Sequence, residues 1–260
     1  MPRQRLGQHF LASAAWRERI LRTLGLRADE TWVEIGAGHG EMTQLLTGSG
    51  RRIIAIETDA RLAAGLGERA SAWPGVEVVG ADALLVDFEA LARDRFRVYG
   101  NLPYYITSPL LHRLFRHADA ITSIHVVIQL EVALRIVAAP GRRDYGYLSV
   151  LCQYYSQPQI VFHVPPGAFR PPPRVTSALV RMQLPGERMA LGLTDDASFL
   201  SFAQAGFGQK RKTLRNNLRL VAPAALVQAA IEVCGLSNNS RAEELTLREL
   251  ADLYIRLHSA

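Results

Sequence analysis

The chain has 260 residues, a formal net charge of +6 and an isoelectric point near 9.7, and 48% of its residues are apolar. This length and composition are ordinary for a soluble globular protein with one large domain and a small appendage. The cationic excess favours a polyanionic partner without requiring one. No apolar run is long enough to span a membrane, so an integral membrane protein is excluded.

Three further features bear on location and chemistry. The first residues faintly imitate a signal peptide, but polar residues at positions 8 and 9 interrupt the stretch that would have to be apolar. Cys152 and Cys234 lie far apart on apolar segments, which favours reduced thiols over a disulfide. His112 and His117 point in different directions on a helix, and no cysteine pair accompanies them. We therefore expect a cytoplasmic protein without a metal site.

The first two thirds of the chain alternate short apolar strands with helical patterns. We expect strands over residues 31–35, 52–56, 76–79, 96–99 and 123–128, with the first two helices over 41–46 and 61–70. This alternation is typical of an α/β fold in which a parallel sheet carries helices on both faces. Two later strands, over 160–164 and 177–184, flank a proline-rich loop and can add an antiparallel edge.

The alternation stops near Leu184, and only helical patterns follow Asp195. The expected helices run over 197–207, 210–221, 223–233 and 246–258. This change of pattern predicts one domain over residues 1–185, a linker over 186–195 and a small helical domain over 196–260.

A glycine-rich turn follows the strand at 31–35. The strand runs into Gly36, Gly38 and Gly40 and then into a helix. Glycines at such a turn let the backbone bend sharply and approach a ligand closely. Glu41 occupies the place of the third glycine in the dinucleotide-binding pattern G-x-G-x-x-G, so the turn alone is a weak signal.

Acidic residues follow the next two strands. Glu57 ends one of them, where an acid can accept both ribose hydroxyls of a nucleoside cofactor. Asp82 follows the other and can accept a hydrogen bond from an adenine amine. Each has an ordinary alternative, since acids are common at strand ends and helix caps. With the glycines, they mark the carboxyl ends of consecutive parallel strands, where open α/β sheets bind ligands.

Residues 100–104 place a carboxamide, a proline and an aromatic ring together at the end of the fourth strand. Methylation of a nucleobase amine needs acceptors that face both N–H bonds, because the lone pair is delocalised into the ring. Asn101 supplies its side-chain oxygen, and Pro103 biases Leu102 towards an extended conformation that can aim its carbonyl inward. Tyr104 offers a ring for base stacking. An ordinary turn after a strand would use the same residue types.

The helical part contains a basic segment. Arg211, Arg215 and Arg219 are four residues apart, so a continuous helix would align them on one face, extended by Lys212. The adjoining buried face would consist of Leu214, Leu218 and Val221. Such a stripe is often only the solvated side of an amphipathic helix. No acid interrupts this stretch, however, which favours contacts with phosphate groups.

These residues together resemble the class I S-adenosylmethionine-dependent methyltransferases, and more narrowly the KsgA (RsmA) type of rRNA adenine N6,N6-dimethyltransferase. The resemblance covers almost the whole chain. It rests on residues 6–11, 33–40, 56–57, 82–83, 101–104, 169–177, 209–218 and 241–243. The N-L-P-Y sequence at 101–104 and the F-x-P-P-P sequence at 169–173 are together highly specific, whereas the glycine motif is not.

The resemblance implies a Rossmann-like sheet, mostly parallel with an antiparallel edge strand, and a small all-α C-terminal domain. It implies S-adenosylmethionine as cofactor, bound by His9, Leu11, Gly36, Gly38, Glu57, Asp82, Ala83 and Asn101. A flipped adenine would meet Asn101, Leu102 and Pro103 and would stack between Tyr104 and Phe169. Without the resemblance, Phe169 reads equally well as a core aromatic that closes a strand connection.

The implied substrate is a pair of adjacent adenosines in the 3′-terminal hairpin of small-subunit (16S) rRNA, within an immature ribosomal subunit. Both would become N6,N6-dimethyladenosine. Phosphate contacts would come from Lys210, Arg211, Lys212, Arg215 and Arg219. We expect a monomer with neither a metal nor a membrane partner.

Several alternatives stay open. The Erm type methylates large-subunit rRNA and shares the motifs at Asn101 and Phe169, although the segment around Arg211 favours the KsgA type. A DNA adenine methyltransferase would need a segment sized for a target-recognition domain, and none is evident. A ribosome-assembly factor, or a transcription factor descended from the family, could use catalysis only secondarily. Intact Glu57, Asp82 and Asn101 argue against lost catalysis without excluding a dual role.

Three positions depart from the family pattern. His9 stands where the family usually has Asn, and an imidazole can also donate and accept hydrogen bonds. Tyr105 follows N-L-P-Y where Asn or Gln is common, and Leu6 replaces Phe. None of the three touches the expected chemistry directly.

Overall fold

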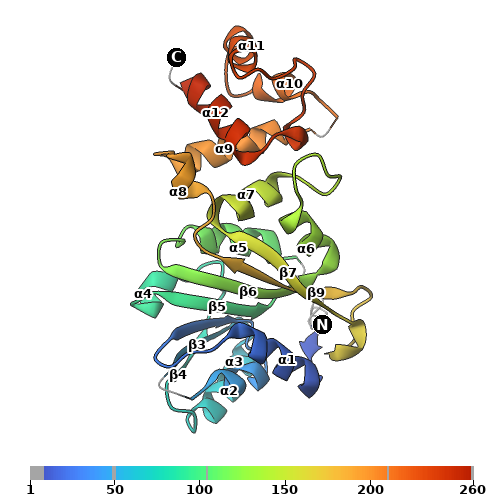
Figure 1. Cartoon of the computed structure of the whole chain (residues 1–260). Helices are drawn as coiled ribbons and strands as arrows, with labels where there is room; N and C mark the ends of the chain where they lie inside the picture. Colours follow the sequence, from blue (N-terminus) through green and yellow to red (C-terminus); the bar gives the residue numbers. More distant parts are fainter. Residues whose placement is uncertain (1–8, 49–50, 104, 210, 259–260) are drawn as a thin grey trace, which may run out of the picture. The chain divides into compact units, whose positions relative to one another are not determined.

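The computed structural model describes residues 9–48, 51–103, 105–209 and 211–258 (Figure 1). The chain divides into two compact units. The sheet unit comprises Met1–Ala133 and Gln159–Leu184, and the helical unit comprises Leu134–Pro158 and Pro185–Ala260. This division differs from the expected one in two places. Residues 134–158 belong to the helical unit although they precede the last strands of the sheet, and residues 186–195, expected to be a linker, belong to the helical unit as well.

The sheet has seven strands in the order β4-β3-β2-β5-β6-β9-β7. The strands are β2 (Thr31–Ile35), β3 (Arg52–Glu57), β4 (Val76–Gly80), β5 (Phe96–Asn101), β6 (Ile121–Gln129), β7 (Gln157–Val164) and β9 (Ser177–Gln183). Strands β2 to β6 pair in parallel, and β9 pairs antiparallel with β6. The predicted parallel sheet with an antiparallel edge is therefore confirmed. Its central strands are buried along most of their length, and β3 carries the continuous apolar run Ile53–Ile56 that strands covered on both faces favour.

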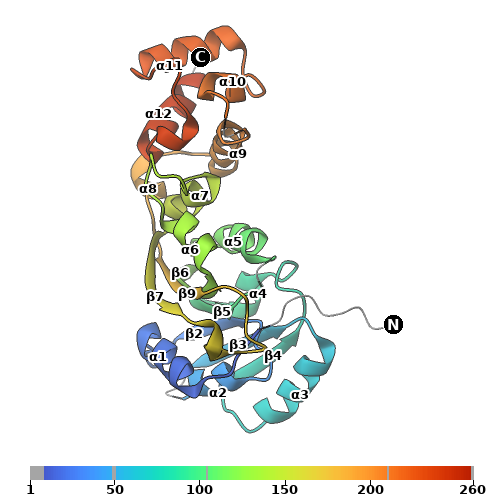
Figure 2. The same cartoon turned by 90° about the vertical axis from the view of Figure 1, so that its right-hand side faces the viewer.

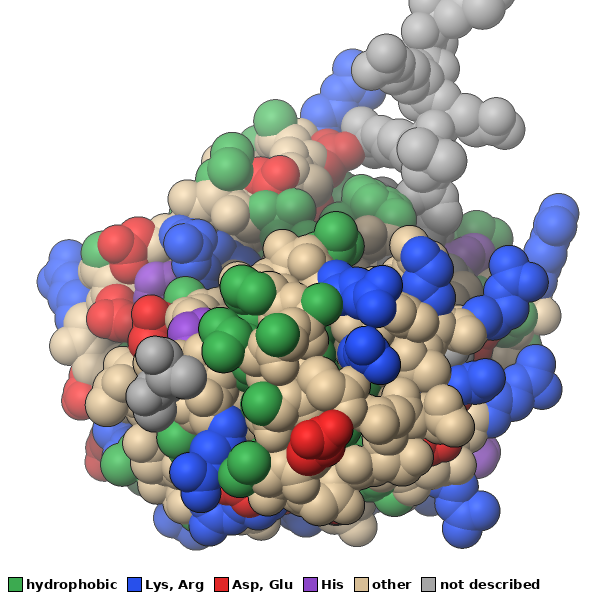
Figure 3. Space-filling view, turned by 90° about the horizontal axis from the view of Figure 1, so that it is seen from above, with side chains coloured by type: hydrophobic (Ala, Val, Ile, Leu, Met, Phe, Trp, Pro, Cys, Tyr) green, Lys and Arg blue, Asp and Glu red, His purple; other side chains and the backbone are tan. Residues whose placement is uncertain are grey.

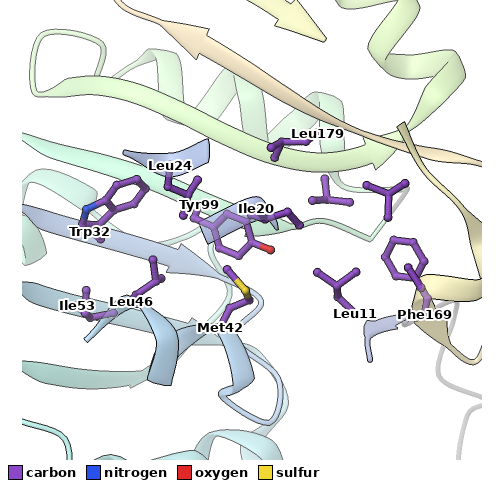
Figure 4. Close-up of a cluster of buried hydrophobic side chains, with 13 residues drawn as sticks. Leu11, Ile20, Leu24, Trp32, Met42, Leu46, Ile53, Tyr99, Phe169 and Leu179 are labelled. Carbon is purple, nitrogen blue, oxygen red and sulfur yellow. The ribbon is translucent and has the colours of Figure 1, made fainter. Parts of the chain in front are cut away.

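Helices cover both faces of the sheet (Figures 1 and 2). They are α1 (Ala14–Leu24), α2 (Glu41–Leu46), α3 (Ala60–Ala70), α4 (Phe88–Ala92) and α5 (Thr107–Phe115). Helix α6 (Leu130–Val137) follows and passes from the sheet unit into the helical unit after Ala133. Helices α1, α2 and α3 lie on one face, and α4 and α5 lie on the other. Figure 4 shows the apolar cluster beneath α1 and α2, where Trp32 and Tyr99 of the sheet pack against Leu24 and Met42.

The order of the strands creates a switch point. Strands β3 and β4 lie on one side of β2, whereas β5 and β6 lie on the other. The chain connections after β2 and after β5 therefore diverge at the carboxyl ends of these two strands. Open α/β sheets bind their ligands at this position.

A second, two-stranded sheet lies in the same unit. Strand β1 (Phe10–Leu11) pairs antiparallel with β8 (Phe169–Arg170), which follows the short 3-10 helix η1 (Pro166–Ala168). Leu11 and Phe169 are opposite each other in this pairing, and Figure 4 shows both at one end of the apolar cluster. The N-terminal segment thus meets the proline-rich loop, about 160 residues further along the chain.

The helical unit explains the unexpected division of the chain. It contains α7 (Tyr147–Tyr155), α8 (Arg188–Leu191), α9 (Asp196–Gly206), α10 (Leu214–Leu218), α11 (Ala224–Val233), the 3-10 helix η2 (Ala242–Glu244) and α12 (Leu247–His258). Tyr154 of α7 donates a hydrogen bond to Asp196 of α9 over 2.6 Å, and its ring packs against Phe199. These contacts bind residues 134–158 to the C-terminal helices.

The expectation of one helix over residues 210–221 is wrong. Among the described residues of this stretch, 211–221, only Leu214–Leu218 are helical. Thr213 is extended, and the Leu214 N–H donates to the Ser240 carbonyl over 2.8 Å. The Asn217 side chain also donates to the Gly206 carbonyl over 2.6 Å. Val221, expected to be buried, is 49% exposed. The conformation of this stretch therefore follows its hydrogen bonds to other segments and not the helical periodicity of its sequence.

None of the helices in the described part of the chain is both long and apolar enough to cross a membrane.

Candidate active site

An open cavity lies in the sheet unit at the carboxyl ends of β2, β3 and β5 and beside the residues that follow β4. The empty space inside it, together with the open solvent at its mouth, is about 1040 Å³. Of the residues expected from the sequence, it brings together His9, Gly36, Glu57, Asp82, Ala83, Asn101, Leu102, Pro103 and Phe169. The cavity occupies the switch point of the sheet.

The glycine turn after β2 forms one wall. Gly36 and Gly38 have φ angles of 73° and 57°, which lie in the left-handed region that favours glycine. A Cβ atom on Gly38 would stand 3.0 Å from the Phe10 ring, so that ring would have to shift to make room for a side chain. Gly36 lines the cavity, whereas Gly38 supports the turn behind it and is not among the lining residues.

Glu57 joins the glycine turn to the end of β3. Its carboxylate is buried, and its two oxygens accept the N–H groups of Gly38 and Asp59, each over 2.9 Å. A carboxylate oxygen can accept more than one hydrogen bond. Glu57 is therefore held in a fixed position at the cavity wall while it keeps acceptor capacity for two hydroxyl groups.

Asp82 and Ala83 form the wall after β4. One oxygen of Asp82 accepts the Leu84 N–H over 2.9 Å, which fixes the carboxylate at the start of the turn. Asp82 is exposed and lines the cavity, so its other oxygen can accept a hydrogen bond from a ligand. Both acids lie where the sequence placed them, at neighbouring strand ends.

The Asn101 carboxamide has a defined orientation at the end of β5. Its Nδ2 donates to the backbone carbonyl of His9 over 2.8 Å. A carbonyl only accepts, so the amide nitrogen must face His9 and the amide oxygen must face away from it. The Leu102 N–H donates to the Val127 carbonyl over 3.1 Å and anchors the next residue to β6. The geometry thus presents Oδ1 of Asn101 as a hydrogen-bond acceptor.

His9 links the N-terminal segment to the proline-rich loop. Its Nδ1 lies 2.7 Å from the Pro171 carbonyl, so this nitrogen carries the proton and donates. The neighbouring Phe10 ring lies 5.0 Å from the His39 ring of the glycine turn. Leu11, expected near the cofactor, is buried in the apolar cluster instead and is not among the lining residues.

Phe169 belongs to the core and to the cavity at once. It is 1% exposed and packs in the same cluster as Leu11 and Tyr99, and it also lines the cavity (Figure 4). Its position is therefore compatible with both interpretations that the sequence allows. Tyr104, the second expected stacking residue, lies outside the described residues.

A buried acid lies beneath the glycine turn. Glu34 is 2% exposed and accepts the Thr43 hydroxyl over 2.6 Å. Burial raises its pKa to about 8, with smaller contributions in the same direction from Glu41 and Glu57, against the lowering effect of Thr43. Glu34 is therefore mainly protonated at neutral pH and adds little negative charge to the region behind the cavity.

Sequence reasoning missed several lining residues. Phe10, Thr58, Tyr105 and Ile106 all line the cavity. Phe10, Thr58 and Tyr105 each directly follow an expected site residue, and Ile106 is the next residue along the chain, so their closeness in sequence was the available signal. Their side-chain directions depend on the turns after the strands, which the sequence pattern does not define.

The basic residues of the helical unit do not share one helix face. Arg211 and Lys212 precede α10, Arg215 lies within it, and Arg219 follows it. Arg211, Lys212 and Arg219 are exposed, whereas Arg215 is half-buried. Lys210 lies outside the described residues. Figure 3, which views the protein from above, shows Lys and Arg side chains beside hydrophobic ones over part of its surface.

Within the described residues, no group of three or more His, Cys, Asp or Glu side chains is arranged to hold a metal ion.

Comparisons with known proteins bear on the family of this chain. The family model for ribosomal RNA adenine dimethylase matches residues 2–259. The ribosomal RNA small subunit methyltransferase A of Acidobacterium capsulatum is 45% identical over 254 residues, which cover 96% of this chain and 89% of the relative. The protein of the same name from Koribacter versatilis is 41% identical over 267 residues, covering 97% and 93%.

Two solved structures share the fold over nearly the full length. The 23S rRNA methyltransferase ErmE is 28% identical with a TM-score of 0.71, covering 96% of this chain and 99% of ErmE. A dimethyladenosine transferase from Plasmodium falciparum is 22% identical with a TM-score of 0.77, covering 94% and 96%.

Proposed function

Because this chain belongs to the ribosomal RNA adenine dimethylase family, we propose that it dimethylates N6 of two adjacent adenosines in the 3′-terminal hairpin of small-subunit rRNA, with S-adenosylmethionine as methyl donor. The observation that carries this proposal is the Asn101 carboxamide. It stands at the end of β5, in one cavity with Glu57 and Asp82, and its oxygen is turned away from the His9 carbonyl. An exocyclic amine needs such an acceptor before it can attack a methyl group.

The cavity fits the cofactor. Glu57 would bind the ribose hydroxyls and Asp82 the adenine amine, with Gly36 allowing close approach of the backbone. Asn101 and the backbone near His9 would border the methyl-bearing end. When bound, S-adenosylmethionine supplies an electrophilic methyl group.

The chain's own residues orient the target base. Oδ1 of Asn101 and the backbone carbonyl of Leu102 would each accept one N–H of the adenine amine, which frees its lone pair. Tyr104 and Phe169 would hold the flipped ring. No strong base is required, because the methylated amine is acidic enough to lose its proton to water. Asn is suited to this position because it accepts hydrogen bonds without adding a negative charge.

The product of the first transfer still carries one N–H, so the same pocket would accept it for a second transfer. The main contribution of the site is therefore orientation of the amine towards the methyl group. Exposed cations of the helical unit, Arg211, Lys212 and Arg219, would contact phosphates without reading the base sequence. We expect the protein to act as a monomer on immature small subunits in the cytoplasm.

The strongest alternative is methylation of large-subunit rRNA, favoured by the likeness to ErmE. A role in subunit assembly, with catalysis secondary, is a further alternative. The Asn101→Ala variant separates catalysis from assembly, since an assembly role would survive the loss of methyl transfer.

The direct test uses labelled S-adenosylmethionine with four substrates: under-methylated small subunits, large subunits, naked rRNA and duplex DNA. We expect N6,N6-dimethyladenosine at two neighbouring positions of the small-subunit rRNA. Methylation only in large subunits or in DNA would refute the proposal.

A further inference from the structure

Tyr105 has a large aromatic side chain that lines the cavity and is exposed to solvent. It is 69% exposed and it lines the same cavity as Asn101. Leu102 is only 3% exposed, and Asn101 is half-buried. The Tyr105 ring therefore stands at the mouth of the cavity.

Residues before and after Tyr105 make backbone hydrogen bonds. The Leu102 N–H donates to the Val127 carbonyl over 3.1 Å, and the Ile106 N–H donates to the Pro103 carbonyl over 3.2 Å. Helix α5 begins two residues later, at Thr107, which is buried. An aromatic side chain has few rotatable bonds, so Tyr105 loses little conformational entropy when it packs against a ligand.

The chemistry of the substrate indicates what could cover this ring. When one adenosine of a pair has turned into the cavity, its neighbour lies at the mouth and has lost a stacking partner. Exposed aromatic side chains bind unpaired bases by stacking, whatever the base, because every base has a π face. A stacked base also shields the exposed ring from water.

We propose that Tyr105 is the stacking platform for the nucleobase next to the flipped adenosine. This inference rests on the proposed function and names a residue that would favour a target adenosine whose neighbouring base is unpaired. While one adenosine of the pair occupies the cavity, the other stacks on Tyr105, and the two exchange places between rounds. The contribution comes from the ring rather than from the hydroxyl group, so phenylalanine should replace tyrosine.

The test uses small subunits reconstituted with rRNA that carries 2-aminopurine at one of the two target positions, together with unlabelled under-methylated subunits for kinetics. Loss of a stacked base costs about 1–3 kcal/mol, so we expect Tyr105→Ala to raise KM for the subunit roughly tenfold. The kcat and the affinity for S-adenosylmethionine should change little. Wild type and Tyr105→Phe should quench 2-aminopurine fluorescence on binding, whereas Tyr105→Ala should not.

Leu85 provides a matched control, because it is 81% exposed in the same unit but is not among the residues that line the cavity. Leu85→Ala should behave as wild type. Equal KM values and equal quenching for wild type and Tyr105→Ala would overturn the inference, as would equal losses in the Tyr105 and Leu85 variants. If wild type itself leaves the small-subunit adenosines unmethylated, the proposed function fails instead, so the two failures are distinguishable.

Discussion

The cavity of the sheet unit and the basic segment 211–219 of the helical unit hold their polar residues in opposite ways. In the cavity, Glu57 and Asn101 are fixed by hydrogen bonds to the backbone of segments distant in sequence. In the basic segment, Arg211 and Arg219 are exposed side chains on either side of a short helix. The cavity is therefore preorganised for chemistry, whereas the basic segment can contribute charge without fixed geometry.

This difference predicts different consequences of substitution. Changes in the preorganised region should alter kcat or the free energy of unfolding, because its groups are buried or fixed in position. Changes in the basic segment should alter affinity and its salt dependence.

The largest effect is expected for Asn101→Ala. Removal of one preorganised hydrogen-bonding group that faces the reacting atom lowers kcat by about 10²–10³-fold in other enzymes, and we expect a similar loss here. Single-turnover methylation of small subunits measures this effect. Calorimetric binding of S-adenosylmethionine is the control and should change little, since Glu57 and Asp82 remain. Dimethylation at the wild-type rate would remove Asn101 from the mechanism.

The next effect concerns stability at Glu34. The unfolded chain releases this proton near pH 4.5 and the folded chain near pH 8, so the free energy of unfolding falls as pH rises between these values. The loss between pH 4 and pH 7 is about 3 kcal/mol. Glu34→Gln keeps the shape and an oxygen for the Thr43 hydroxyl but cannot ionise.

We therefore expect Glu34→Gln to be more stable than wild type at pH 8 and similar to it at pH 4. Urea unfolding at the two pH values measures the difference. If the free energy of unfolding of Glu34→Gln fell between pH 4 and pH 8 by as much as that of wild type, Glu34 would not be the group responsible for the loss, and burial would not hold it protonated in the folded protein.

A smaller effect of opposite pH dependence is expected at His125 in β6. Burial, together with Arg97 and Arg181, lowers its pKa to about 3, and neither ring nitrogen has a hydrogen-bond partner among the described residues. The unfolded chain binds this proton near pH 6.5, so the free energy of unfolding falls as pH drops below that value. Between pH 7 and pH 5 the loss is about 2 kcal/mol.

His125→Phe should reduce this acid sensitivity, because a phenyl ring takes up no proton. Thermal unfolding at pH 5 and pH 7 compares the variant with wild type. His163→Phe, at an exposed position in β7, is the matched control and should leave the pH dependence as it is. An unchanged pH dependence in His125→Phe would assign the acid sensitivity to other groups.

The comparison of the two regions also shows which features a sequence can predict. Glu57, Asp82 and Asn101 were predictable because parallel strands bring their carboxyl ends to one edge, so each needed only a correct strand end. The orientation of the Asn101 amide could not be predicted from the sequence, because it depends on a hydrogen bond to the His9 carbonyl, 92 residues away. The short length of α10 could not be predicted either, because the Ser240 carbonyl that accepts the Leu214 N–H comes from a distant segment.

The smallest effects are expected for single charge reversals in the basic segment. If Arg211 and Arg219 both contact phosphates, Arg211→Glu and Arg219→Glu should each weaken binding to small subunits about tenfold, and each should reduce the slope of log K against log salt by about one. The double variant should show the sum of both changes.

Arg248→Glu, at an exposed cation of α12 in the same unit, is the matched control for net charge. Equal losses in Arg248→Glu would mean that binding depends on the total charge of the unit. A slope unchanged in the double variant would show instead that residues 211–219 do not contact the RNA, and the contrast between a preorganised cavity and an RNA-binding basic segment would no longer hold.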